Sequence, residues 1–172
     1  MIFPKAQIAV LFFISMALMG CGSQSFFKVD IITGGIGFGG TFRFQIDQDK
    51  IVVYEQGYGP RNLLQMIPWE KIYETSIREK QATDLNEAFS LIPFSSLNKM
   101  YRAENIFDGG YLEVLVRTRR LQWPKQVRLE NCQIAEINKA LLLVSELLAS
   151  EESGPEEALS YLSYFLEEVP DC

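Results

Sequence analysis

Between residues 41 and 47, apolar and polar side chains alternate, with Phe42, Phe44 and Ile46 on one face and charged or amide side chains on the other. A period of two residues is typical of a β-strand with one covered face. Similar patterns predict further extended segments over residues 26–32, 51–54, 63–73, 111–118 and 127–129. Pro68 falls within one of these segments and favours an edge strand or a bulge there.

Elsewhere, apolar residues recur at spacings of three and four, which is typical of amphipathic helices. This spacing predicts helices over residues 76–92, 134–148 and 156–168. We expect the first helix to open at Ser76, which stands at capping-box spacing from Glu79, and to end before Pro93. The intervening segment 94–101 is predicted to be irregular.

The predicted strands come in runs and are not strictly interleaved with helices. This order favours an α+β fold, with an antiparallel sheet of about five to six strands and two to three helices packed on one face. The length of 172 residues suits one domain. We assign residues 26–150 to this domain and residues 151–172 to an acidic C-terminal helical extension.

The first 20 residues have a different pattern, which is that of a signal peptide. Lys5 is followed by the apolar run 6–19, which is shorter than the ~20 residues that a membrane-spanning helix needs. The run closes with Leu18-Met19-Gly20-Cys21, which resembles the lipobox of bacterial lipoproteins. The alternatives are an ordinary signal peptide or a short anchor helix with an incidental cysteine.

The lipobox resemblance implies cleavage between Gly20 and Cys21 and acylation of Cys21. Two or three acyl chains hold a protein firmly on a bilayer, so a membrane is an expected partner. Residues 21–25 would then be the lipidated cysteine and a short tether. Gly22 stands where an aspartate commonly signals inner-membrane retention, which favours the periplasmic face of the outer membrane in a Gram-negative cell.

Composition excludes several function classes. The chain has no histidine, so Ser-His-Asp and Cys-His catalysis are impossible within it and the commonest zinc ligand is missing. The formal charge is −6, and residues 151–172 contain acids but no base. Nucleic acid is not an expected partner, because binding it requires a basic surplus. We expect the protein not to be an enzyme and to have no catalytic residues, no metal ligands and no cofactor. A histidine-free hydrolase that uses carboxylates such as Asp47, Asp49 and Glu113 is a less favoured hypothesis.

The glycine-rich segment 34–40 contains the G-x-G-x-x-G spacing after a predicted strand. A dinucleotide site also needs a helix to begin there, so that its amide groups can bind the pyrophosphate. The next residues alternate as a strand, so we expect no nucleotide and interpret the glycines as a hairpin connection or bulge.

Basic residues gather on the predicted hairpin that ends the sheet. They surround one tryptophan, and the set comprises Arg117, Arg119, Arg120, Trp123, Lys125 and Arg128. One interpretation is a solvated face offset by nearby acids. The other is an interaction surface for an anionic partner, such as lipid headgroups, envelope glycan or an acidic protein, unless the acidic extension neutralises the hairpin.

Cys132 and Cys172 are the cysteines that remain once Cys21 is lipidated. An oxidising compartment would permit a disulfide between them. The alternative is a lone core residue at Cys132 and a free thiol at the end of the chain.

The pattern from Val29 to about Leu148 resembles small envelope lipoprotein domains of unknown function. The resemblance rests on the glycine-rich break, the Val53-Tyr54-Glu55 strand and the helix that ends near Pro93-Phe94. The chain also resembles emfourin-type proteinase inhibitors, which have a Gly-Gly-aromatic start, although Ile36-Gly37 separates Gly35 from Phe38 here. These resemblances imply an α+β fold more than an activity, and two hypotheses for function remain. The first is a non-enzymatic binding or scaffolding lipoprotein with an envelope protein or glycan as partner, and it rests on the lipobox, the missing histidine and the lack of a complete catalytic set. The second is a periplasmic proteinase inhibitor that uses the loop 34–40, and it rests on the inhibitor resemblance and the glycine content of that loop.

Overall fold

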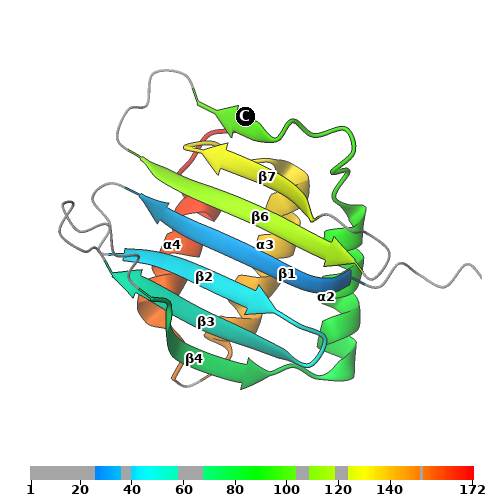
Figure 1. The fold of residues 1–172 in the computed structure, drawn as a ribbon, viewed down its shortest axis with the longest axis vertical. Coiled ribbons are helices and arrows are strands. Elements are labelled where there is room, and N and C mark those ends of the chain that lie inside the picture. Colours follow the sequence, from blue (N-terminus) through cyan, green and yellow to red (C-terminus); the bar gives the residue numbers. More distant parts are fainter. Residues whose placement is uncertain (1–25, 36–39, 58–67, 104–108, 119–123, 152) are drawn as a thin grey trace, which may run out of the picture.

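A computed structural model describes residues 26–35, 40–57, 68–103, 109–118, 124–151 and 153–172. Its centre is one seven-stranded sheet with the order β4-β3-β2-β1-β6-β7-β5 (Figure 1). The strands are β1 (Phe26–Gly35), β2 (Gly40–Ile46), β3 (Lys50–Gly57), β4 (Glu70–Ser76), β5 (Met100–Arg102), β6 (Gly110–Thr118) and β7 (Lys125–Glu130). The first strand therefore lies in the middle of the sheet.

The α+β class is confirmed, but the sheet is larger than predicted and mixed in direction. Neighbouring strands run antiparallel except β5, which pairs parallel to β7 through Met100 opposite Arg128 and Arg102 opposite Glu130. The segment containing β5 was predicted to be irregular. A strand of three residues has too few positions to show an alternating pattern, so its partner β7 defines it.

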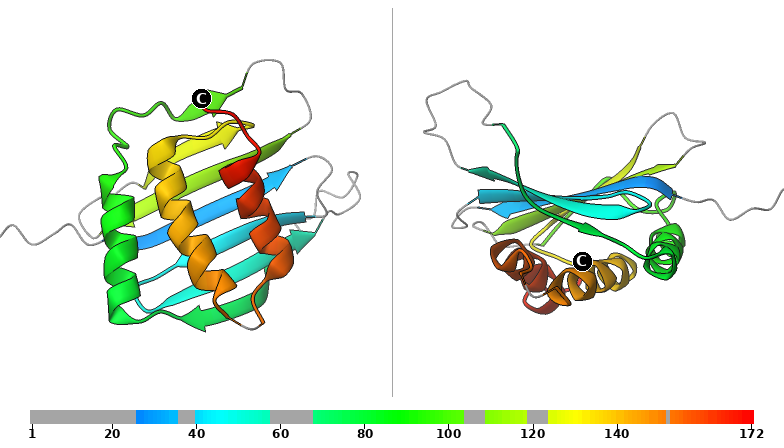
Figure 2. Two further views of the ribbon diagram at one scale, coloured as in Figure 1. Left: turned by 180° about the vertical axis from the view of Figure 1, so that it is seen from behind. Right: turned by 90° about the horizontal axis from the view of Figure 1, so that it is seen from below.

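The three helices of the described residues cover the same face of the sheet (Figure 2). They are α2 (Glu79–Leu91), α3 (Ala135–Ala149) and α4 (Glu156–Glu167). The predicted helix start at Ser76 is wrong, because Ser76 ends β4 opposite Lys50 of β3. The helix starts three residues later, where the Arg78 N–H donates a 2.7 Å hydrogen bond to the Gln81 side chain.

The core lies between the helices and the covered face of the sheet. Alternate residues of β2 are buried there, which confirms the predicted inward face of Phe42, Phe44 and Ile46. The apolar stripes of the helices meet them, with Leu85 and Phe89 from α2 buried against the sheet. Side chains that alternate in the sheet thus point either into this core or onto the opposite, uncovered face.

The C-terminal segment joins the same core. Helix α4 buries Tyr161, Leu162 and Phe165, and Val169 after it is also buried. The chain then runs beside Gln133, whose N–H donates to the Pro170 carbonyl while its own carbonyl accepts from the Cys172 N–H. The acidic residues of this segment that the structure describes are exposed to solvent.

In the structure a disulfide joins Cys132 and Cys172, with a Cα–Cα distance of 5.0 Å. Cys132 is buried and Cys172 is exposed. The bridge closes 40 residues of chain, so it ties the end of the chain to the start of α3.

Candidate functional site

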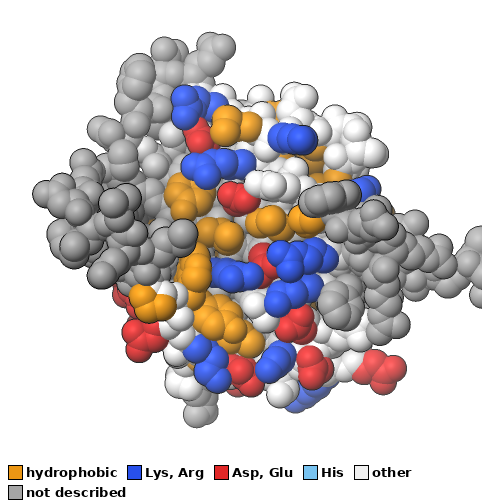
Figure 3. Space-filling view, in the orientation of Figure 1, with side chains coloured by type: hydrophobic (Ala, Val, Ile, Leu, Met, Phe, Trp, Pro, Cys, Tyr) orange, Lys and Arg blue, Asp and Glu red, His pale blue; other side chains and the backbone are white. Residues whose placement is uncertain are grey.

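The face of the sheet away from the helices is the candidate site, and we call it the open face (Figure 3). Strand alternation and the register place on it one row formed by Gln45 of β2, Asp30 of β1 and Leu115 of β6. The next row contains Arg43, Ile32 and Glu113. Figure 3 shows hydrophobic, basic and acidic side chains interspersed over this surface, which is more apolar than the polar face usual for a sheet exposed to water.

A buried carboxylate stands near the middle of the open face. The Arg43 Nε and Nη2 atoms lie 2.9 and 2.6 Å from the same oxygen of Asp30. The Arg117 Nη2 atom lies 3.9 Å from the other Asp30 oxygen, which accepts no hydrogen bond from the described residues. Asp30 is only 2% exposed. A carboxylate buried this deeply is tolerated because guanidinium groups neutralise it and donate to it.

Three bases lie around Asp30, and the next carboxylate on this face is Asp47, which accepts a 3.2 Å hydrogen bond from Gln45 Nε2. Lys28 stands directly opposite Arg117 in the β1–β6 register, one alternation from Asp30 on the same face. Arg43 and Arg117 keep 27% and 48% of their side-chain surface exposed. We call Lys28, Asp30, Arg43 and Arg117 the Asp30 cluster, and it carries more positive than negative charge toward solvent.

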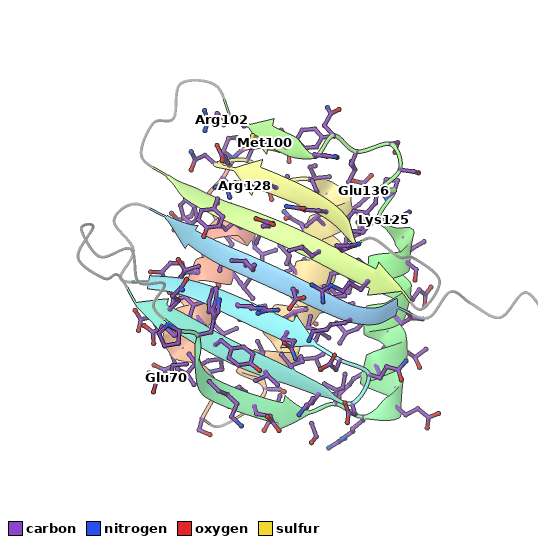
Figure 4. The ribbon with its side chains drawn as sticks, viewed as in Figure 1. Glu70, Met100, Arg102, Lys125, Arg128 and Glu136 are labelled. Carbon is purple, nitrogen blue, oxygen red and sulfur yellow. A yellow bond between two sulfur atoms is a disulfide. The ribbon has the colours of Figure 1, made fainter. Side chains whose placement is uncertain are left out.

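A second group of charges is balanced. Glu130 of β7 accepts a 2.6 Å hydrogen bond from Arg102 Nε and a 2.9 Å bond from Arg128 Nε. Arg128 also lies 3.7 Å from Glu113, and its guanidinium stands 4.2 Å from the centre of the Tyr111 ring. We call these five residues the Glu130 network. Figure 4 shows Arg102 and Arg128 beside Met100 at one edge of the sheet, with Glu70 at the opposite edge.

The environment of Glu130 changes its acidity. Burial acts to raise the pKa of this carboxyl, but the hydrogen bonds and charges of Arg102 and Arg128 outweigh burial, so the pKa is lowered from its usual 4.5. Glu130 is therefore ionised near neutral pH and holds both guanidinium groups in fixed positions.

Apolar and aromatic side chains lie between these charged groups. Val52 of β3 is 2% exposed, and Ile32, Tyr54 and Leu115 are half-buried. At the two edges the exposure is greater, with Met100 at 54% and Ile72 at 41%. The open face thus combines apolar surface with guanidinium groups in fixed positions.

The helix layer has the opposite electrostatic character. Its three helices contain the bases Lys80 and Lys139 only. Their acids are more numerous, and comprise Glu79, Asp84, Glu87, Glu136, Glu146, Glu156, Glu157 and Glu167. The two faces of the molecule therefore differ in sign of charge.

The predicted basic hairpin is divided by the structure. Arg117 belongs to the Asp30 cluster and Arg128 to the Glu130 network. Lys125 is exposed at the start of β7, in register with Val116, so alternation places it toward the helix side of the sheet. Arg119, Arg120 and Trp123 lie outside the described residues. Within the described residues, the ion partners of these arginines come from the sheet and not from the acidic C-terminal segment.

Other sequence-based expectations fall outside the described residues. These are the leader, Gly20 and Cys21, the tether, and the centre of the glycine-rich loop, residues 36–39. Of the carboxylates considered for hydrolysis, Asp47 and Asp49 lie at the β2–β3 turn, whereas β1 separates β2 from the strand of Glu113.

Sequence reasoning missed Asp30 as the centre of a charge cluster. One signal was present, because Asp30 is a charged residue between Val29 and Ile31 in a predicted strand. Its burial depends on the central position of β1, which only the strand order shows.

Within the described ranges no helix is both long and apolar enough to cross a membrane. The same residues contain no group of acidic or cysteine side chains arranged to hold a metal ion. Comparison of the chain with protein-family models, curated proteins and solved structures found no match.

Proposed function

We propose that this chain is a lipid-anchored envelope protein with a binding or scaffolding role and no catalytic one. The signal-peptide pattern and the Leu18-Met19-Gly20-Cys21 motif support the anchor. Acyl chains on Cys21 would hold the protein at the periplasmic face of the outer membrane in a Gram-negative cell. The folded part then needs no apolar face for membrane residence, so its open face is free to bind.

The observation that carries the binding role is the composition of the open face. Interfaces between proteins are enriched in tyrosine, methionine and arginine. The part of the open face toward β5 has this composition, with Tyr111, Met100 and the paired guanidinium groups of Arg102 and Arg128. Arginines that internal carboxylates already hold lose little conformational entropy when a partner binds. A protein or glycan of the envelope is the partner that we propose.

The anchor is tested by replacing the acylated thiol. In the expressing bacterium, Cys21→Ser is expected to release the protein from the membrane fraction, and the intact mass of the wild-type protein should show cleavage before Cys21 plus acyl chains. A wild-type mass that equals the uncleaved, unmodified chain would contradict the anchor.

The binding role is tested by cross-linking in whole cells at native expression. We expect the wild-type chain to capture a discrete protein or glycan, and Arg102→Glu to reduce that capture several-fold. Lys139→Glu is the matched control, since it makes the same charge change on the helix layer and should leave capture unchanged. Absence of any captured partner, or equal loss with both variants, would contradict a role for the open face.

A further inference from the structure

The Asp30 cluster lies at the end of the open face where the chain enters the sheet. Strand β1 begins at Phe26, which pairs with Thr118, and Lys28 pairs with Arg117. The Glu130 network lies further along the face, since Tyr111 pairs with Gly34 near the other end of β1. The entry of the chain and the positive surplus are therefore at one end, and the balanced network is toward the other.

The cluster is built to present positive charge outward. Asp30 accepts the Nε and Nη2 groups of Arg43, which fixes this guanidinium while 27% of the side chain remains exposed. Arg117 is 48% exposed, and its ion pair with Asp30 is 3.9 Å long. Asp30 and Asp47 are thus two carboxylates beside three basic side chains, and the remaining positive charge is available to an anion. Guanidinium groups bind phosphate oxygens through paired N–H donors.

The distance from the proposed anchor is short. Cys21 precedes Phe26 by five residues, and an extended chain covers at most about 3.6 Å per residue. The start of β1 then stays within roughly 18 Å of the lipid-bearing residue. At this separation the cluster samples the membrane surface at high effective concentration, so weak electrostatic attraction is sufficient for contact.

The charge of the helix layer also affects how the domain would lie on a membrane. The helices carry acids such as Glu136 and Glu157 and few bases, so an anionic surface repels that layer. A bilayer that contains anionic lipid therefore favours one orientation, with the start of β1 toward the headgroups.

We infer that the Asp30 cluster binds the phosphate groups of anionic phospholipids and orients the domain on its membrane. This inference rests on the proposed lipid anchor. It leaves the Glu130 network, at the other end of the open face, turned away from the bilayer and accessible to a partner.

The test uses the full chain extracted from membranes and reconstituted in nanodiscs, either of phosphatidylcholine alone or with phosphatidylglycerol added. Acetylation of lysines is followed by mass spectrometry. Lys28 is expected to react at least threefold more slowly in the anionic discs than in the neutral ones. Salt at about 0.5 M should remove this difference, because it screens the attraction between exposed charges. Lys139 on the helix layer should react equally in both.

Arg117→Gln keeps the Asp30–Arg43 contact and removes one outward charge. It is expected to weaken the protection of Lys28, whereas Lys80→Gln, the same change on the helix layer, should not. Equal labelling of Lys28 in both lipids would overturn the inference and leave an acidic protein as the ligand of this cluster. A chain that does not co-purify with either disc would instead contradict the lipid anchor. Failure of the anchor and failure of phosphate binding are therefore distinguishable.

Discussion

Arg43 reaches across the β1–β2 pair so that its Nε and Nη2 atoms lie 2.9 and 2.6 Å from one oxygen of Asp30. Asp30→Asn keeps the shape of the side chain but removes its charge, which leaves the guanidinium groups of Arg43 and Arg117 without a counter-ion. Because hydrogen bonds to charged groups contribute about 1.5–3 kcal/mol, we expect the free energy of unfolding to fall by that amount. Urea denaturation measures it.

The matched control for this change is Glu74→Gln. Glu74 also pairs with two bases, Lys50 at 3.6 Å and Lys71 at 3.3 Å, but its side chain is 40% exposed. An exposed ion pair contributes about 0–1 kcal/mol. Equal losses in the two variants would show that Asp30 is no more important to the fold than a surface carboxylate.

Gly109 and Asn131 lie so close together that there is no room for a side chain at position 109. A β-carbon at Gly109 would lie 1.5 Å from the Asn131 Oδ1 atom, and Asn131 has a φ of 57°. Gly109→Ala is therefore expected to destabilise the fold by about 1–3 kcal/mol through overpacking. Asn131→Gly removes the clashing side chain and accepts a positive φ easily.

A double-mutant cycle separates this clash from a general effect on the loop. In the Asn131→Gly background, Gly109→Ala should cost much less than it does alone. If both backgrounds show the same loss, the contact between the two residues is not the cause.

The pH dependence of stability is expected to include a contribution from Glu130. Its pKa is lowered in the fold, since Arg102 and Arg128 outweigh the effect of burial. Folding thus favours the ionised carboxyl, and the stabilisation is fully present above pH 4.5 and is lost as the pH falls through the lowered pKa of the folded state.

Glu130→Gln should therefore reduce the free energy of unfolding at pH 7 and make a smaller difference near pH 3. Arg102→Met keeps Glu130 but removes one guanidinium partner, so it should remove part of the same dependence. Urea denaturation at a series of pH values checks both variants. A difference between wild type and Glu130→Gln that stays constant from pH 7 to pH 3 would contradict the linkage.

The disulfide predicts a redox-dependent stability. Closing 40 residues between Cys132 and Cys172 is expected to contribute about 3–4 kcal/mol in the loop-entropy description. Thiol counting on exported protein should find neither cysteine free until a reductant is added. Reductant should lower the free energy of unfolding of the wild-type chain and leave that of Cys172→Ser unchanged, and a free Cys172 in the untreated protein would contradict the bridge.

The parts of the fold that the sequence predicts well are those whose pattern is long and local. Strand β2 alternates over its whole length, and α3 and α4 repeat at helical spacing over several turns, so their own residues define them. Ser76 shows the limit of this reasoning. Its spacing to Glu79 satisfies a local capping pattern, but pairing with Lys50 extends β4 through Ser76, and tertiary pairing overrides the local preference.

The candidate site was less predictable, because its contacts join strands that are not neighbours in sequence. Alternation places Arg43 on the polar face of its strand but does not show which carboxylate it binds. Arg117 and Arg128 belong to one hairpin, yet the register with β1 and β5 assigns them to different groups on the open face. Strand order therefore determines the site more than any motif does.

The place of α4 in the core gives a last prediction. Phe165 is 2% exposed, and a β-carbon at Gly110 of β6 would lie 3.2 Å from its ring, so the ring packs closely on the sheet. Phe165→Ala is expected to lower the free energy of unfolding by about 3–5 kcal/mol, because it leaves a cavity between α4 and the sheet. Leu166→Ala changes the adjacent, half-buried residue of the same helix and should cost clearly less. Urea denaturation measures both losses in the free energy of unfolding. Equal, small losses for the two variants would contradict the packing of α4 and the acidic C-terminal segment against the sheet.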